Sequence, residues 1–165
     1  MAYVDKVLDH FAEPRNVGPI PAADGVGLTG DASCGDVFKA WIRVRDGRIA
    51  RAAFKVMGCP AAIACGSMMT LLAEGLTLDE ALGLSDDDIV AALGELPELK
   101  LHCSNSAAEA LHAAVDDHRY RLADAGRSES LTVLEKLVQE MRRLCLTRGL
   151  LPEPERTRSG YRSYD

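Results

Sequence analysis

The stretch "DVFKAWIRVRDGRIARAAFKVMG", residues 36–58, decides the fold. Apolar and polar side chains alternate on both sides of Asp46 and Gly47, and a period of two is typical of strands with one buried face. Asp-Gly is a favoured two-residue hairpin turn, because both of its positions need positive φ. We therefore predict two antiparallel strands here, and a third strand in the preceding "GVGLTGDAS".

Helical patterns surround these strands. Residues 3–12 place four apolar side chains on one face, which predicts a short helix docked by that face: Val4, Val7, Leu8 and Phe11. After the strands, small and unbranched residues predict a helix from about 60 to 74, ended by Gly75. Thr77 and Ser85 then open two short helices. Because strands and helices come in blocks, we predict the α+β class: a small three-stranded antiparallel sheet packed against several helices.

The C-terminal part of the chain predicts two long helices and a tail. Residues 104–124 are amphipathic and start with a capping-box pair, Ser106 and Glu109. A separate apolar stripe over 130–148 predicts an extra C-terminal helix, and 151–165 is polar and interrupted by proline. We expect a domain over 1–125, an additional helix over 126–150 that packs on it or on a partner, and a disordered tail over 151–165.

Composition excludes several classes of protein. The 165 residues are 47% hydrophobic, enough to bury a core, and 25 acidic against 19 basic residues give a net charge of -6. This acidic balance argues against nucleic acid as the partner. The sequence holds no apolar run of roughly 18 residues and starts with a charged, amphipathic segment unlike a secretory signal. We expect a cytoplasmic protein with no membrane partner.

Three of the five cysteines occupy predicted element ends. Cys34 lies at a turn between strands, Cys59 precedes Pro60 as a candidate N-cap, and Cys103 lies just before a long helix. Helix N-termini favour the thiolate, which binds metals and attacks sulfur. With Asp36 and His102 the set offers three sulfurs plus a carboxylate or an imidazole. The spacing is no local metal motif, so a shared metal site and three unrelated thiols stay open alternatives from the residues alone.

For the other cysteines and for most of the histidines, a packing role is a better interpretation than a role as metal ligand. Cys65 and Cys145 continue apolar patterns, and three histidines lack metal-ligand spacing: His10, His112 and His118. Lys100, three residues before Cys103, either lowers the pKa of that thiol or is simply solvated. Asp36 by itself could equally satisfy the backbone amides of its turn.

Four blocks of the sequence resemble one family, the iron-sulfur cluster assembly scaffolds of the IscU type and the N-terminal domain of NifU. They are "SCGDVFKAWIRVRDGRI", "FKVMGCPAAIACGSMM", "LTLDEALGLSDDDIVAALGELPELKLHCS" and "AAEALHAAV", and the resemblance covers about residues 2–122. It implies a non-enzymatic scaffold on which Fe2+ and desulfurase-derived sulfur form a transient 2Fe-2S cluster for transfer to apo-proteins. The implied partners are a cysteine desulfurase, apo iron-sulfur proteins and a ferredoxin or frataxin-like protein.

The resemblance also implies roles for single residues. Cys34, Cys59 and Cys103 would be the cluster ligands, with Asp36 beside them and His102 as the alternative fourth ligand. Cys103 would also accept persulfide sulfur. Since clusters are usually held by four thiolates, an oxygen ligand would leave one iron easier to exchange. We further expect His102 and Cys103, as neighbours in an extended segment, to point to opposite faces.

The chain also departs from the family's pattern. The chaperone-binding segment of the family reads close to LPPVK, where this chain has "LPELK" at residues 96–100, and the missing proline argues against an Hsp70-type chaperone as a partner. An alternative function is that of a zinc-bound sulfur acceptor of the SufU type, since three thiolates with Asp36 or His102 also suit tetrahedral Zn2+. That branch carries a longer insertion between its second and third cysteines, so the scaffold is favoured.

Overall fold

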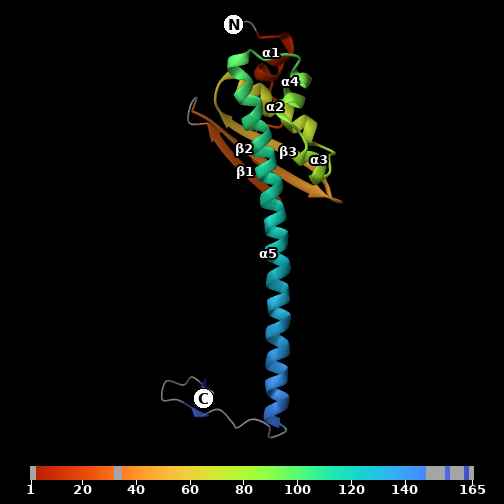
Figure 1. The fold of residues 1–165 in the computed structure, drawn as a ribbon, viewed down its shortest axis with the longest axis vertical. Helices are drawn as coiled ribbons and strands as arrows, with labels where there is room; N and C mark the ends of the chain where they lie inside the picture. Colours follow the sequence, from red (N-terminus) through yellow and green to blue (C-terminus); the bar gives the residue numbers. More distant parts are fainter. Residues whose placement is uncertain (1–2, 32–34, 148–154, 157–161, 164–165) are drawn as a thin grey trace. The chain divides into compact units, whose positions relative to one another are not determined.

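The computed structural model describes residues 3–31, 35–147, 155–156 and 162–163, with side chains described over 3–30 and 35–125. The chain divides into two units, Met1–Arg121 and Leu122–Asp165. The first unit holds a sheet and the helices packed on it (Figure 1). Within the second, residues Glu155–Arg156 (β4) and Arg162–Ser163 (β5) pair antiparallel, while most of the tail predicted to be disordered lies outside the described residues.

The sheet is three-stranded, antiparallel and ordered β1-β2-β3, as predicted. Its strands are β1 (Gly25–Asp31), β2 (Asp36–Arg45) and β3 (Arg48–Met57). Asp46 and Gly47 link β2 to β3 with φ of 52° and 73°. Both angles are positive, which is the requirement that made Asp-Gly a hairpin signal.

Helices follow the sheet as predicted, together with one short 3-10 helix that was not predicted. They are α2 (Pro60–Ala73), α3 (Leu78–Leu82), α4 (Asp86–Leu93), the short 3-10 helix η1 (Glu98–Lys100) and α5 (Leu101–Thr147). Thr77 and Ser85 are the N-caps of α3 and α4, each in a reciprocal capping box with the carboxylate three residues later. No helix in the described part of the chain is both long enough and apolar enough to cross a membrane.

Two predictions about helix ends were wrong. Residues 104–124 and 130–147 belong to one helix, α5, because Gly126 and Ser128 weaken a helix by only about 1 kcal/mol each or less and no proline interrupts it. That helix begins at Leu101, so Ser106 and Glu109 lie inside it and form no capping box.

The N-terminal helix α1 (Asp5–Ala12) is present, but it buries only part of the predicted face. Val7 and His10 are buried, whereas Val4, Leu8 and Phe11 are exposed. The reason is polar: His10 Nδ1 lies 2.8 Å from Ser67 Oγ on α2, so the face that carries Val7 and His10 packs against α2, and Leu8 and Phe11 lie outward.

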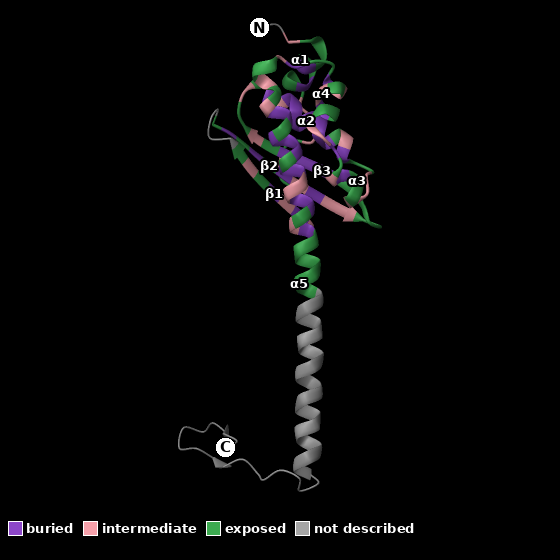
Figure 2. Ribbon diagram, viewed as in Figure 1, coloured by how far each residue is buried: buried purple, intermediate pink, exposed green. Residues whose placement is uncertain are grey.

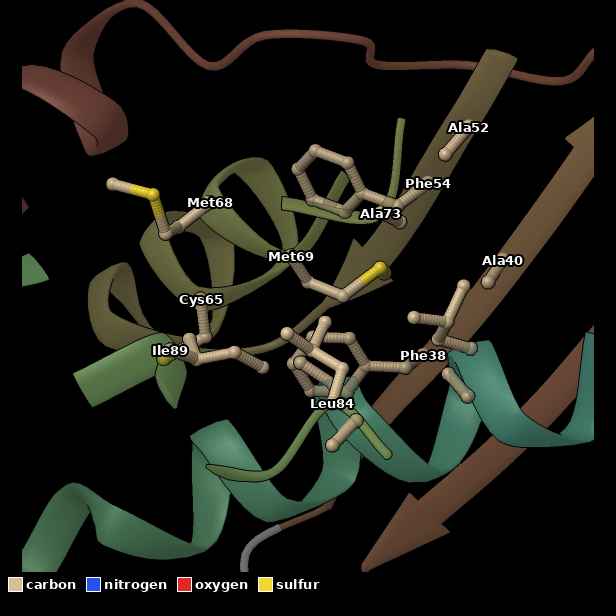
Figure 3. Close-up of a cluster of buried hydrophobic side chains, with 14 of the residues drawn as sticks. Phe38, Ala40, Ala52, Phe54, Cys65, Met68, Met69, Ala73, Leu84 and Ile89 are labelled. Carbon is tan, nitrogen blue, oxygen red and sulfur yellow. The ribbon is translucent and has the colours of Figure 1, made fainter. Parts of the chain in front are cut away.

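The core lies between the sheet and the helices (Figure 2). At two glycines a helix and a strand come so close together that a side chain would not fit between them. A Cβ on Gly66 of α2 would lie 2.3 Å from the Phe54 ring of β3, and one on Gly27 of β1 would lie 2.0 Å from the carbonyl oxygen of Ala110 on α5. Phe38, Phe54 and Met69 fill the space between (Figure 3). Helices α2 and α5 therefore cover the same face of the sheet.

Candidate metal site

Three potential metal ligands from distant parts of the sequence converge. The ligand atoms of Asp36, Cys59 and Cys103 all lie within 4.8 Å of one another. Cys103 Sγ lies 3.7 Å from Cys59 Sγ, and it donates a hydrogen bond to Asp36 Oδ2 over 3.5 Å. Sulfurs that bind one metal at about 2.3 Å each lie about 3.8 Å apart in tetrahedral geometry. The two cysteines are thus already at a spacing that a shared metal requires.

The ends of β2 and β3 position the carboxylate and the first thiol. Asp36 is the first residue of β2 and is buried, and Cys59 is the N-cap of α2 with Pro60 in the first helical turn, as predicted. Gly58 connects β3 to Cys59, and an added Cβ there would lie 2.7 Å from Asp36 Oδ1. The Asp36 carboxylate therefore occupies space that only glycine leaves free.

The start of α5 supplies the second thiol. Cys103 is the third residue of that helix and is completely buried, whereas Cys59 is partly exposed. Burial raises the pKa of Cys103, and a charge on Cys59 would raise it further. In the metal-free protein this burial acts against the effect that we expected from the helix N-terminus, which favours the thiolate.

His102 belongs to the same cluster. Its Nε2 lies 3.4 Å from Cys103 Sγ and 3.9 Å from Asp36 Oδ2. The expectation that His102 and Cys103 point to opposite faces was wrong, because both residues are helical rather than extended. An imidazole and a carboxylate are thus both within reach of the same sulfur.

Two further side chains, those of Lys100 and Tyr3, interact electrostatically with Cys59. The charge of Cys59 raises the pKa of Lys100, whose ammonium group stays exposed to solvent. Burial raises the pKa of Tyr3, and Cys59 contributes in the same direction. Nothing in the sequence pointed to Tyr3, because its proximity depends on how α1 packs.

The remaining predicted residues fall into two groups. Cys65 is fully buried in the core, and burial raises its pKa to about 12. His112 Nε2 donates to the Leu84 carbonyl over 3.0 Å, and His118 Nδ1 donates to the Asp24 carbonyl over 3.3 Å, so both have packing roles. Cys34, and the side chain of Cys145, lie outside the described residues. Convergence of Cys34 with the other ligands stays a prediction.

A family model matches most of the chain. The model of the NifU-like N terminal domain matches residues 2–125. The chain belongs to this family. The resemblance stated from the sequence blocks is thereby confirmed.

Relatives of the chain extend the comparison. It is 47% identical over 139 residues to the iron-sulfur cluster assembly scaffold protein IscU 1 of Archaeoglobus fulgidus, covering 84% of this chain and 90% of that protein. It is 46% identical over 123 residues to the IscU scaffold protein of Escherichia coli K12, covering 72% and 95%. Because 139 residues cannot fit within the first 125, the archaeal similarity continues into α5 beyond the family match.

Solved structures share the fold. The N-terminal part of a nitrogen-fixing NifU-like protein from Brucella abortus superposes with a TM-score of 0.60 at 16% identity, covering 71% of this chain and 94% of that one. A putative SUF-system scaffold protein from Fervidobacterium islandicum gives 0.58 at 18% identity, covering 68% and 96%. At such identities these likenesses establish the fold alone.

Proposed function

We propose that this protein is a scaffold on which iron and desulfurase-derived sulfur assemble into a transient 2Fe-2S cluster that passes to apo-proteins. The observation that carries the proposal is the convergence of Asp36, Cys59 and Cys103 in a chain of this family. Close relatives bear the name of iron-sulfur cluster assembly scaffolds, which supports the same function here.

The proposed ligands are Cys34, Cys59 and Cys103, with Asp36 or His102 in the fourth position. Thiolates are the usual ligands of iron-sulfur clusters. A carboxylate oxygen is a harder ligand and binds the cluster iron less firmly than sulfur. Asp36 would therefore make one iron exchangeable, which suits a cluster that must leave.

Cys103 is the proposed acceptor of persulfide sulfur from a cysteine desulfurase. Its thiol is buried, so we infer that desulfurase binding has to open the start of α5 before sulfur transfer. The persulfide on Cys103 takes up two electrons and two protons to give the free thiol and hydrogen sulfide, which explains the proposed ferredoxin-like partner. The protein accepts sulfur and is not a turnover catalyst.

A reducing compartment fits this chemistry. Cys59, Cys65 and Cys103 are free thiols, and thiols stay reduced in the cytoplasm. We therefore propose a cytoplasmic location. The partners in this proposal are the desulfurase and the recipient apo-proteins.

Anaerobic reconstitution with a desulfurase, cysteine and ferrous iron tests the function, with absorption and Mössbauer spectra as the readout. We expect a 2Fe-2S spectrum from the wild type and from Cys65→Ser, and its loss in Cys59→Ser and Cys103→Ser. Uptake of zinc alone, with no cluster under any condition, would replace the scaffold with the zinc-bound sulfur acceptor, whose tetrahedral donor set these residues also suit.

A further inference from the structure

The face of the sheet that the helices leave uncovered carries an exposed group of side chains next to the metal site. In one row of the sheet, Gly27, Ala40 and Phe54 pair across the strands and face α5 and α2. Side chains alternate between faces along a strand, so the adjacent rows face the other way. We call the exposed members of those rows the sheet patch: Leu28, Val37, Lys39, Lys55 and Met57.

Two lysines lie directly opposite each other in this patch. Lys39 pairs with Lys55 across β2 and β3, and Lys39 Nζ lies 5.3 Å from the centroid of the Trp41 ring, which holds it in place. Like charges directly opposite each other destabilise a sheet. Among the described side chains, neither lysine forms an ion pair, whereas nearby Arg43 pairs with Asp24. Within residues 3–30 and 35–125, these two facing positive charges are thus uncompensated.

Apolar side chains surround the lysines. Met57 and Leu28 are 70% and 65% exposed, and Val37 pairs with Met57. An apolar centre beside fixed charge is the usual composition of a protein-binding surface. Isolated exposed apolar residues are common, but here three of them lie in two consecutive rows of the same face of the sheet.

Charge indicates what could cover the patch. The protein has a net charge of -6, so the patch is positive against the sign of the whole molecule. Residues 148–165 do not supply the missing negative charge, since they hold four arginines against three acidic residues. Complementarity therefore favours another protein with a carboxylate-rich surface.

The patch also adjoins the metal site. Val37 follows Asp36 directly, and Met57 is separated from Cys59 by Gly58 alone. We propose that the sheet patch docks recipient proteins through carboxylates that surround an apolar spot, so that the recipient's ligands approach the edge of the cluster site. This inference rests on the proposed function, because it assigns the patch to the transfer step.

The test measures binding of cluster-free scaffold to an acidic 2Fe-2S ferredoxin in its apo form, by calorimetry at low and moderate salt. The matched variants are Lys55→Glu, in the patch, and Lys6→Glu, exposed on α1, which change the net charge equally. We expect Lys55→Glu to weaken binding by about tenfold or more, because it turns attraction into repulsion, and Lys6→Glu by less than about twofold. Amidating the ferredoxin carboxylates should weaken binding to the wild type similarly.

Several results would overturn the inference. If Lys55→Glu and Lys6→Glu weakened ferredoxin binding equally, binding would depend on the net charge of the protein and not on the sheet patch. Self-association that Lys55→Glu abolishes in sedimentation would assign the patch to a second copy, and Lys55-dependent binding to phosphatidylserine vesicles would assign it to a membrane surface. Reconstituting each variant without ferredoxin separates the two proposals: intact assembly with unchanged ferredoxin binding rejects the patch alone, while failed assembly in the wild type rejects the scaffold function.

Discussion

The sulfurs of Cys59 and Cys103 lie 3.7 Å apart, although 44 residues separate them in the sequence. One is the N-cap of α2 and the other lies in the first turn of α5, so two helix starts meet at one point. Asp36 at the start of β2 completes the cluster. The geometry of the site therefore depends on how β2, α2 and α5 pack together. The contribution of each ligand residue can be tested separately.

Oxidation of the metal-free protein should join these two sulfurs. A disulfide needs about 2.05 Å between sulfurs, so a small side-chain movement from 3.7 Å is sufficient. We expect diamide to produce a Cys59–Cys103 disulfide, detected by peptide mapping under non-reducing conditions. Cys65→Ser should form it equally well, since Cys65 is buried in the core. Failure of the wild type to form this bond would contradict the observed spacing.

Alkylation rates should follow burial. Because burial raises the pKa of Cys103, less of this thiol is ionised at a given pH, and it should react with iodoacetamide more slowly than the partly exposed Cys59. Cys65, with its pKa raised to about 12, should be the slowest of the three. The rates are measured by mass spectrometry in chelated, metal-free protein between about pH 7 and 9, where thiols begin to ionise. Faster reaction of Cys103 than of Cys59 would restore the helix-dipole interpretation.

Removing the carboxylate should stabilise the bound cluster. Asp36→Ala eliminates the oxygen that competes with sulfur for iron, so we expect slower cluster decay and slower transfer to an apo-ferredoxin, followed by absorption. Asp5→Ala, an exposed carboxylate on α1, is the control and should behave as the wild type. Equal or faster release from Asp36→Ala would argue against a role in lability.

The sequence predicted the sheet and most helix boundaries because local signals control them. Asp46 and Gly47 fix the hairpin, and Thr77 and Ser85 cap their helices within three residues of chain. Prediction from the sequence failed where contacts between distant parts of the chain determine the structure. The outward position of Leu8 and Phe11 on α1 follows from the contact of His10 with Ser67, 57 residues away, and the raised pKa of Cys103 follows from burial. The convergence of Cys59 with Cys103 likewise needed packing that no local motif encodes.

Gly58 offers the sharpest test of how the fold holds the site. In Gly58→Ala the added Cβ would lie 2.7 Å from Asp36 Oδ1, so we expect the carboxylate to be displaced and cluster lifetime to move toward that of Asp36→Ala. The double variant Asp36→Ala/Gly58→Ala relieves the clash, because alanine is shorter than aspartate. We therefore expect Gly58→Ala to change both the cluster lifetime and the free energy of unfolding when Asp36 is present. In the Asp36→Ala background the same substitution should change both quantities much less. A double-mutant cycle measures this coupling. Additive effects would mean that Gly58 acts on the backbone between β3 and α2, and not through the Asp36 carboxylate.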